Sequence, residues 1–220
     1  TLIYNKTSGS VALNGETLAA ISVTNGGETA QLQAVGARGD TLDGLATISA
    51  GLLSFGSSST SDIGGLNISG GIVRIAGGGG ATTLNVGSSG IVASGGEIQV
   101  KFSTTDNSAT LNLGGNLTAT GNLIFTNANY TGTAANVVNL TADRTFDISA
   151  GATVTIAPDI SGPGGLTKTG EGTLLLTSAS NGIYTGPTVL SAGTFLLSGS
   201  IGNDDPNDAI PAGTDVVVNG

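Results

Sequence analysis

The residues from Gly151 to Ser198 read GATVTIAPDISGPGGLTKTGEGTLLLTSASNGIYTGPTVLSAGTFLLS. Three apolar segments in this stretch open on a glycine, GATVTI at Gly151, GTLLLT at Gly172 and GTFLLS at Gly193, and a fourth, GTDVVV, follows at Gly213. These glycines are 21, 21 and 20 residues apart. A fixed spacing near twenty residues is typical of repeat architectures, in which each repeat stacks on the next.

The same spacing extends upstream in a less regular form. Gly51, Gly71 and Gly90 also open apolar segments, at intervals of 20 and 19 residues. Between about residues 104 and 144 the apolar alternation continues, but the glycine spacing slips. The sequence therefore predicts a loop insertion or an irregular turn in that region.

The segments between the glycines have the pattern of short half-buried strands. Apolar residues alternate with polar ones in runs such as Val154/Ile156 and Leu174/Leu176, and Gly, Asn, Ser, Thr and Asp separate the runs. Sandwiches and propellers repeat at other intervals, whereas a parallel β-helix suits a period near twenty. We expect an all-β fold, a parallel β-helix (solenoid) with about 20 residues per turn. We expect residues 1–220 to be a single β-helix segment of a longer protein.

Composition and charge exclude several classes of function. The chain of 220 residues has 15 acidic and 6 basic side chains and a formal net charge of −9, which disfavours nucleic acid as a partner. It has no His and no Cys, so the common catalytic triads and thiol nucleophiles are absent. No stretch is long and apolar enough to span a bilayer, so we expect no membrane insertion by this segment.

Residues Gly162 to Ser200 resemble the autotransporter-associated β-strand repeat of bacterial passenger proteins. The family pattern is matched at Gly164, Gly165, Leu166, Thr167, Lys168, Gly170, Gly172, Thr173, Leu174, Asn181, Tyr184, Thr185, Gly186, Val189, Gly193 and Thr194. The resemblance, at 162–200, implies a right-handed parallel β-helix at the bacterial cell surface without catalytic residues. We also expect Gly164 and Gly165 to form tight corners, and Tyr184 to keep its hydroxyl in water.

These observations predict a non-catalytic extracellular protein of the bacterial cell surface. It would act as an adhesin stalk or as a structural fibre or coat component. Its expected partners are neighbouring copies or further repeats of the parent chain, in end-to-end or lateral assembly, and host-cell or surface glycans. The alternative is a carbohydrate-binding or carbohydrate-cleaving β-helix, as in tailspikes and lyases. Electron microscopy would separate a self-assembling sheath from a lone stalk.

Two groups of acidic residues are candidate sites. The cluster around Asp204, Asp205 and Asp208 offers hard oxygen ligands that suit calcium, although it lacks the spacing of an EF-hand loop. Asp40 and Asp43, with Arg38 nearby, form the only compact arrangement that could serve a glycosidase-type mechanism. For both groups a solvated loop is the plainer interpretation. We expect no cofactor, with calcium as the one candidate ion.

Overall fold

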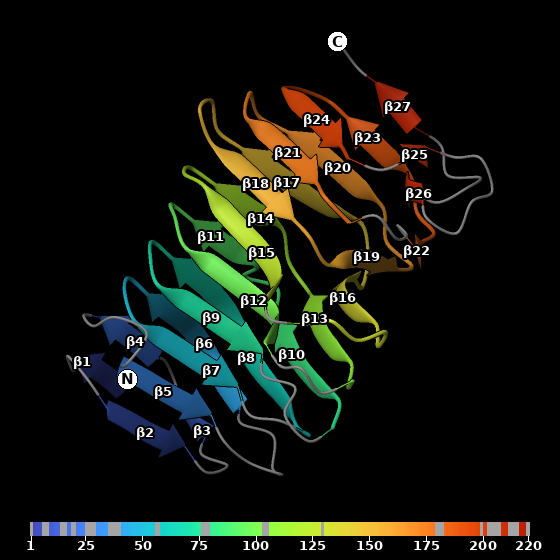
Figure 1. Ribbon diagram of the computed structural model, residues 1–220. Helices are drawn as coiled ribbons and strands as arrows, with labels where there is room; N and C mark the ends of the chain where they lie inside the picture. Colours follow the sequence, from blue (N-terminus) through green and yellow to red (C-terminus); the bar gives the residue numbers. More distant parts are fainter. Residues whose placement is uncertain are drawn as a thin grey trace.

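Short strands joined by tight polar turns wind the chain into an all-β parallel solenoid, which we describe from a computed structural model (Figure 1). The structure describes residues 2–5, 9–13, 17–18, 21–24, 30–34, 41–55, 58–75, 80–102, 106–128, 130–178, 183–198, 200–201, 208–210 and 216–218. Every strand pair within these ranges is parallel, as the sequence predicted. No helix in them has the length and apolar character of a membrane span.

Each turn runs along three faces in the same order. The first face contains β3 (Thr17–Leu18), β10 (Thr82–Val86), β13 (Ala109–Leu113), β16 (Asn136–Leu140), β19 (Asp159–Gly162) and β22 (Ile183–Tyr184). The second contains β1 (Leu2–Asn5), β4 (Ile21–Thr24), β11 (Ile91–Ala93), β14 (Leu117–Ala119), β17 (Arg144–Ile148), β20 (Leu166–Thr169), β23 (Thr188–Leu190) and β27 (Val216–Val218). The third contains β2 (Gly9–Leu13), β5 (Ala30–Ala34), β7 (Leu52–Phe55), β9 (Ile72–Ile75), β12 (Glu97–Phe102), β15 (Leu123–Ala128), β18 (Thr153–Ile156), β21 (Thr173–Leu176) and β24 (Thr194–Leu197).

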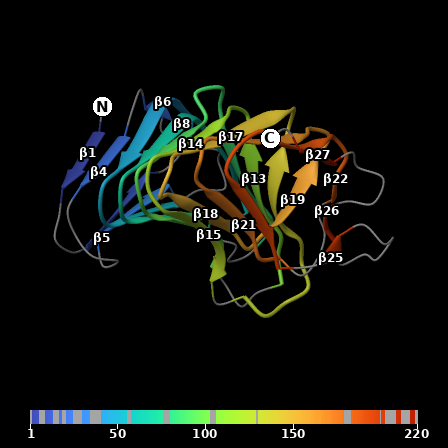
Figure 2. The same ribbon diagram turned by 90° about the horizontal axis from the view of Figure 1, so that it is seen from above.

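Two long strands join the first and second faces. The first halves of β6 (Thr41–Ile48) and β8 (Thr60–Ile68) pair in the first face, and their second halves pair in the second. In the five later turns, from β10 to β24, three separate strands form each turn. The short pair β25 (Ser200–Ile201) and β26 (Asp208–Ile210) lies outside the three faces, and Figure 2 shows it at the C-terminal side of the stack.

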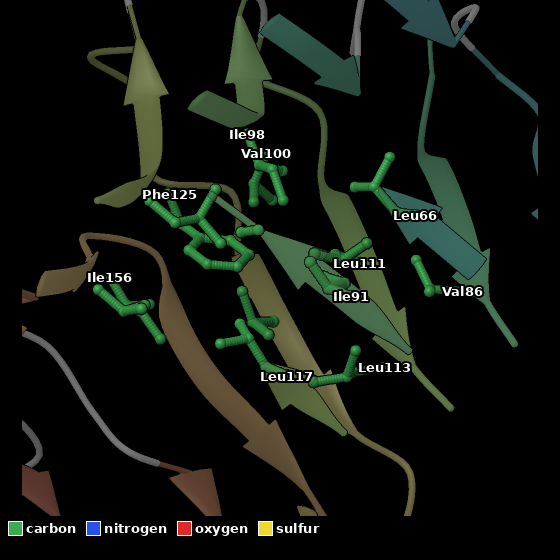
Figure 3. Packing of buried hydrophobic residues seen from close by; sticks show 14 of the residues in the cluster. Leu66, Val86, Ile91, Ile98, Val100, Leu111, Leu113, Leu117, Phe125 and Ile156 are labelled. Atoms are coloured by element: carbon green, nitrogen blue, oxygen red, sulfur yellow. The ribbon is translucent and has the colours of Figure 1, made fainter. Parts of the chain in front are cut away.

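Inward side chains stack into columns along the axis. On the third face, residues in register form one such column: Leu53, Val73, Ile98, Phe125, Ile156, Leu176 and Leu197. All of them belong to the hydrophobic core or pack against it. Figure 3 shows Phe125 and Ile98 meeting Leu111, Ile91 and Leu117 from the other two faces. Each turn thus buries its apolar side chains against the turns above and below.

The number of residues per turn follows the expected period at both ends and exceeds it in the middle. Leu53 and Val73 are 20 residues apart, and Ile156 and Leu176 are again 20 apart. In between, the spacing is 25 from Val73 to Ile98, then 27 to Phe125 and 31 to Ile156. The period of about 20 thus holds at the ends, whereas the central turns are longer because extended connections join the third face to the first there. The predicted irregularity between residues 104 and 144 is confirmed.

Glycine is required at the corner between the second and third faces. Gly71, with φ +74°, precedes β9, and a Cβ there would lie 2.7 Å from the carbonyl oxygen of Gly51 in the preceding turn. Only glycine adopts this left-handed conformation without steric cost. Gly90 does not continue this series, because it precedes β11 at the corner between the first and second faces. Gly96, directly before β12, occupies the equivalent position in that longer turn.

A ladder of side-chain amides follows the outside of the first face. The Nδ2 atoms of Asn85, Asn112 and Asn139 each donate to the register partner in the preceding turn, at 2.6 Å, and the first acceptor is Oδ1 of Asp62. The Ser161 hydroxyl donates to Asn139 Oδ1 at 3.4 Å. Stacked amides of this kind fix the register of successive parallel strands from the outside.

We predict that Phe125→Ala lowers the free energy of unfolding by about 3–5 kcal/mol, because it opens a cavity in the stacked core. Ile124→Ala is the matched control, since Ile124 precedes Phe125 in β15 but is 43% exposed. Urea denaturation followed by circular dichroism measures both. Similar losses for the two variants would contradict the assignment of inward and outward positions.

Candidate functional site

The main irregularity of the solenoid is a cluster at the corner between the third and first faces. The connections from β12 to β13 and from β15 to β16 both lie there, in successive turns. The cluster comprises Lys101, Asp106, Tyr130, Thr133, Ala134 and Asn136, and we call it the corner cluster.

Asp106 organises the corner cluster through its carboxylate. Its Oδ1 accepts hydrogen bonds from the Tyr130 hydroxyl at 2.5 Å, the Thr133 amide at 2.8 Å and the Ala134 amide at 2.6 Å. Its Oδ2 accepts from the Thr133 hydroxyl at 3.1 Å. Asn136 adds a bond from Nδ2 to the Ala134 carbonyl. One side chain of the earlier connection thus binds Tyr130, Thr133 and Ala134 of the later connection.

These bonds stabilise the ionised form of Asp106. They lower its pKa from 3.8 to about 2, with the Tyr130 hydroxyl as the largest cause. Desolvation, followed by the same contact with Asp106, raises the pKa of Tyr130. A carboxylate that is held by structural donors is a poor general base, so the geometry fits a loop anchor better than a catalytic acid or base.

Lys101 lies beneath the loops with no exposed surface. Its Nζ donates to the Asn107 carbonyl and lies 5.4 Å from the centroid of the Tyr130 ring. Desolvation lowers the pKa of its ammonium, and the negative charge of Asp106 opposes this effect. Sequence reasoning missed Lys101 and Asp106, and the slipped glycine spacing between residues 104 and 144 was the only signal for them.

A polar network lies on the outer side of the third face next to the corner cluster. Arg74 Nε donates to Gln99 Oε1 at 2.6 Å, and the Arg74 guanidinium stacks on Phe102, 3.4 Å from the ring centroid. Glu97 Oε1 accepts from Gln99 at 3.2 Å and from the Thr126 hydroxyl at 2.7 Å. The network therefore ties β9, β12 and β15 together across three successive turns.

The outer side of the second face carries an open depression of about 220 Å³. Small polar and apolar side chains from four successive turns line it, among them Thr47, Asn67, Val92 and Thr120. Its lining contains no carboxylate, no basic group and no aromatic ring. A sugar-cleaving site needs paired carboxylates, so this depression does not provide one.

The acidic residues singled out in the sequence lie largely beyond the described part of the chain. Asp204, Asp205, Arg38 and Asp40 fall outside it, while Asp43 and Asp208 belong to β6 and β26. Calcium binding by Asp204, Asp205 and Asp208 stays a prediction. Within the described ranges, no three His, Cys, Asp or Glu side chains gather as a metal-binding group.

The C-terminal turns contain a second buried lysine. Lys168 occupies an inward position of β20, between Phe146 and Leu190 in the stacked register, and is 1% exposed. Its Nζ donates to the carbonyls of Thr169 at 2.6 Å, Gly170 at 2.7 Å and Ala192 at 3.2 Å. Desolvation by burial lowers the pKa of this ammonium, while the negative charges of Asp147 and Glu171 act in the opposite direction. The alternation Leu166, Lys168 was visible in the sequence as the signal for this inward position.

The glycines and the tyrosine of this stretch are also structural. A Cβ on Gly164 would lie 1.9 Å from the Ala142 carbonyl oxygen, so the tight corner predicted there is confirmed. The expectation of a solvated Tyr184 hydroxyl is wrong. Tyr184 is fully buried at the position in register with Gly162, and its hydroxyl is 2.5 Å from Thr188 Oγ1.

Comparison with protein-family models gives one match, at residues 166–197, to the passenger-associated-transport-repeat. Residues 166–197 are similar to this repeat, and we refer to them as the passenger repeat. The passenger repeat thus begins at β20 and ends with β24, and it contains Lys168, Tyr184 and the corner glycine Gly193. A search of curated proteins and a search of solved structures each returned no match.

The passenger repeat and the parallel β-solenoid together fit a passenger-type surface protein. The repeat family implies a secreted, surface location and suggests a structural role.

We predict that Asp106 titrates with a midpoint near pH 2. Its pKa is depressed in the folded state, so its stabilising contacts are complete above the ordinary pKa near 3.8 and are lost as the pH falls through about 2. The amide resonances of Thr133 and Ala134, followed by NMR, report this loss. In Asp106→Ala both amides should exchange rapidly at every pH, while the Thr173 amide, bonded to Ala152, stays protected. A midpoint near 4 would contradict the anchor role.

We predict that Lys168→Met lowers the free energy of unfolding by about 1–3 kcal/mol, because three carbonyls in the passenger repeat lose their donor. Thr167→Ala, one residue earlier at an outward position, is the control and should change little. Thermal and urea denaturation measure the free energy of unfolding of both variants. A Met variant as stable as the original protein would show that the carbonyls find water instead.

Proposed function

We propose that the chain is a stiff, non-catalytic segment of a secreted bacterial surface protein, acting as an adhesin stalk or as a fibre or coat component. The observation that carries this proposal is the unbroken stacking of the third face. Nine parallel strands follow one another from β2 to β24, and an apolar column runs beneath the later ones. At the interstrand distance this is a rod of roughly 40 Å.

Most of the described carboxylates are hydrogen-bonded to the scaffold, which favours a structural role over catalysis. Asp62, Glu97, Asp106, Asp143 and Asp159 each accept a hydrogen bond from a neighbouring group of the scaffold. None of these five lines the depression on the second face. The carbohydrate-cleaving alternative would need two carboxylates free to act on a glycosidic bond.

Exposed strand edges at the ends of a solenoid favour assembly. The last third-face strand, β24, has one hydrogen-bonding partner in the described structure, β21. Its Leu196 and the Val217 and Val218 side chains of β27 are 42–68% exposed. Such an edge pairs readily with another strand, so further repeats of the parent chain or neighbouring copies are the partners that we propose, with surface glycans as targets of the assembled protein.

Electron microscopy of the purified protein tests the proposal. We expect rods or filaments with a repeat along their length, and resistance to proteases at concentrations that degrade loosely folded proteins. Release of reducing sugar from a panel of polysaccharides would overturn the non-catalytic role.

A charge on the edge strand β24 tests the route of assembly. Leu196 is 48% exposed there, so Leu196→Lys should reduce end-to-end association without unfolding the rod. Val92→Lys is the matched control, because Val92 is also 48% exposed but lies on β11, which is paired on both sides. Sedimentation velocity measures the association of both variants. Equal association of the two would count against assembly through this edge.

Strictly monomeric, compact particles at high concentration would contradict the role as a fibre or coat component. The adhesin stalk would then be the remaining form of the proposal. Binding to host cells or isolated glycans, measured with the same preparation, separates an adhesin from a purely structural component.

A further inference from the structure

Next to the corner cluster, the strand register places the buried amine of Lys101 beside Asn127, whose carboxamide oxygen is buried. Lys101 on β12 and Asn127 on β15 are register partners in adjacent parallel strands, just after the bulge between Gln99 and Lys101. Paired residues on neighbouring strands lie roughly 5 Å apart at their backbones and project to the same side. The two side chains therefore share one small volume at the end of the third face, below the loop that Asp106 anchors.

Both groups are in an unusual state for a protein interior. Lys101 is fully buried, which destabilises its charged form. The Oδ1 atom of Asn127 is buried and has no hydrogen-bond partner. Among the buried side-chain nitrogen and oxygen atoms that the structure describes, it is the only one in this state. Buried polar atoms in native proteins nearly always have a partner, so an orphan carbonyl oxygen calls for an explanation.

We propose that the side chains of Lys101 and Asn127 join in an isopeptide bond that links two successive turns. An uncharged lysine amine is a competent nucleophile toward carbonyl carbon, and burial favours this form. The carboxamide is the acyl donor. Its carbonyl oxygen is not engaged by another donor and is free to take up the negative charge of a tetrahedral intermediate.

The reaction balances without a co-reactant. The ammonium gives up a proton to water, and Nζ forms a bond to Cγ of Asn127. The bond from Cγ to Nδ2 then breaks, and protons from Nζ and from water pass to the leaving nitrogen, which departs as ammonium. The lysine ammonium and the released ammonium ion each carry one positive charge, so charge balances. Nothing is oxidised or reduced.

The fold supplies the positioning that this reaction needs. The strand register holds the two residues together, which replaces the entropy cost of a bimolecular encounter. In the unreacted structure Nζ is hydrogen-bonded to the Asn107 carbonyl, so this bond must break before Nζ attacks Cγ. The product removes the buried charge and closes a loop between residues 101 and 127, which restricts the unfolded chain.

Lys168 provides an internal comparison. It is buried to nearly the same degree, but its register partners are Phe146 and Leu190, which carry no acyl group. Its ammonium is held by three backbone carbonyls. Burial of a lysine alone therefore does not predict a cross-link, and Lys168 should keep a free amine.

Mass spectrometry of the intact protein tests the bond directly. We expect a mass lower than that of the sequence by one ammonia. Lys101→Met and Asn127→Ala should each have their full calculated mass, and Lys168→Met should still lack one ammonia. The mass of the original protein decides the question, because the bond forms only in folded protein; each variant is therefore shown to fold by circular dichroism before its mass is interpreted.

A tryptic digest then locates the change. Trypsin cuts after Lys and Arg, and the sequence places Arg74, Lys101 and Arg144 in succession. A modified Lys101 blocks cleavage, so residues 75–144 should appear as one peptide lighter by one ammonia. A simple missed cleavage has full mass, and a succinimide would lose ammonia yet leave Lys101 cleavable, so either result would contradict the bond.

A full intact mass for the original protein, with Lys101 open to an amine-reactive reagent after denaturation, overturns the proposal. A loss of one water would assign the acyl group to a carboxylate such as Asp106 and would also overturn the assignment to Asn127. Neither result bears on whether the protein forms rods, so this test is independent of the proposed function.

Discussion

The structure depends on one constraint, that each inward side chain must lie directly over its counterpart in the turns above and below. No single turn contains enough apolar surface to form a core, so its strands are stable only through their neighbours. Ile98 illustrates this, because it is covered by Val73 on one side and by Phe125 on the other. The register of every strand is consequently a condition of stability.

The repetitive part of this architecture could be predicted from the sequence, since identical spacing produces identical geometry. The alternation Val154/Ile156 and Leu174/Leu176 placed the correct residues inside. Gly51 and Gly71 marked a true corner, but Gly90 matched their spacing by coincidence, because its turn is longer and its corner is a different one. The spacing of glycines alone cannot distinguish the corner between the first and second faces from the corner between the second and third faces.

The corner cluster could not be predicted, because it depends on contacts between loops from different turns. Asp106 and Ala134 are 28 residues apart, and only the extended connections bring them together. Polar residues at inward positions could be predicted only in part, because the alternation gives their phase but not the partners of their polar atoms. Lys168 and Tyr184 occupy core positions because backbone carbonyls and Thr188 satisfy their polar atoms, which a pattern of apolar residues does not reveal.

The amide ladder on the first face gives the rod a direction. Asn85, Asn112 and Asn139 all donate toward the N-terminal side, so their dipoles add along the axis instead of cancelling. The series terminates in an anionic acceptor, Asp62, at one extremity and in a neutral hydroxyl, Ser161, at the other. The ladder therefore has a carboxylate acceptor at its N-terminal end and a hydroxyl donor at its C-terminal end, so the outer side of the first face changes in chemical character along the axis between β8 and β19.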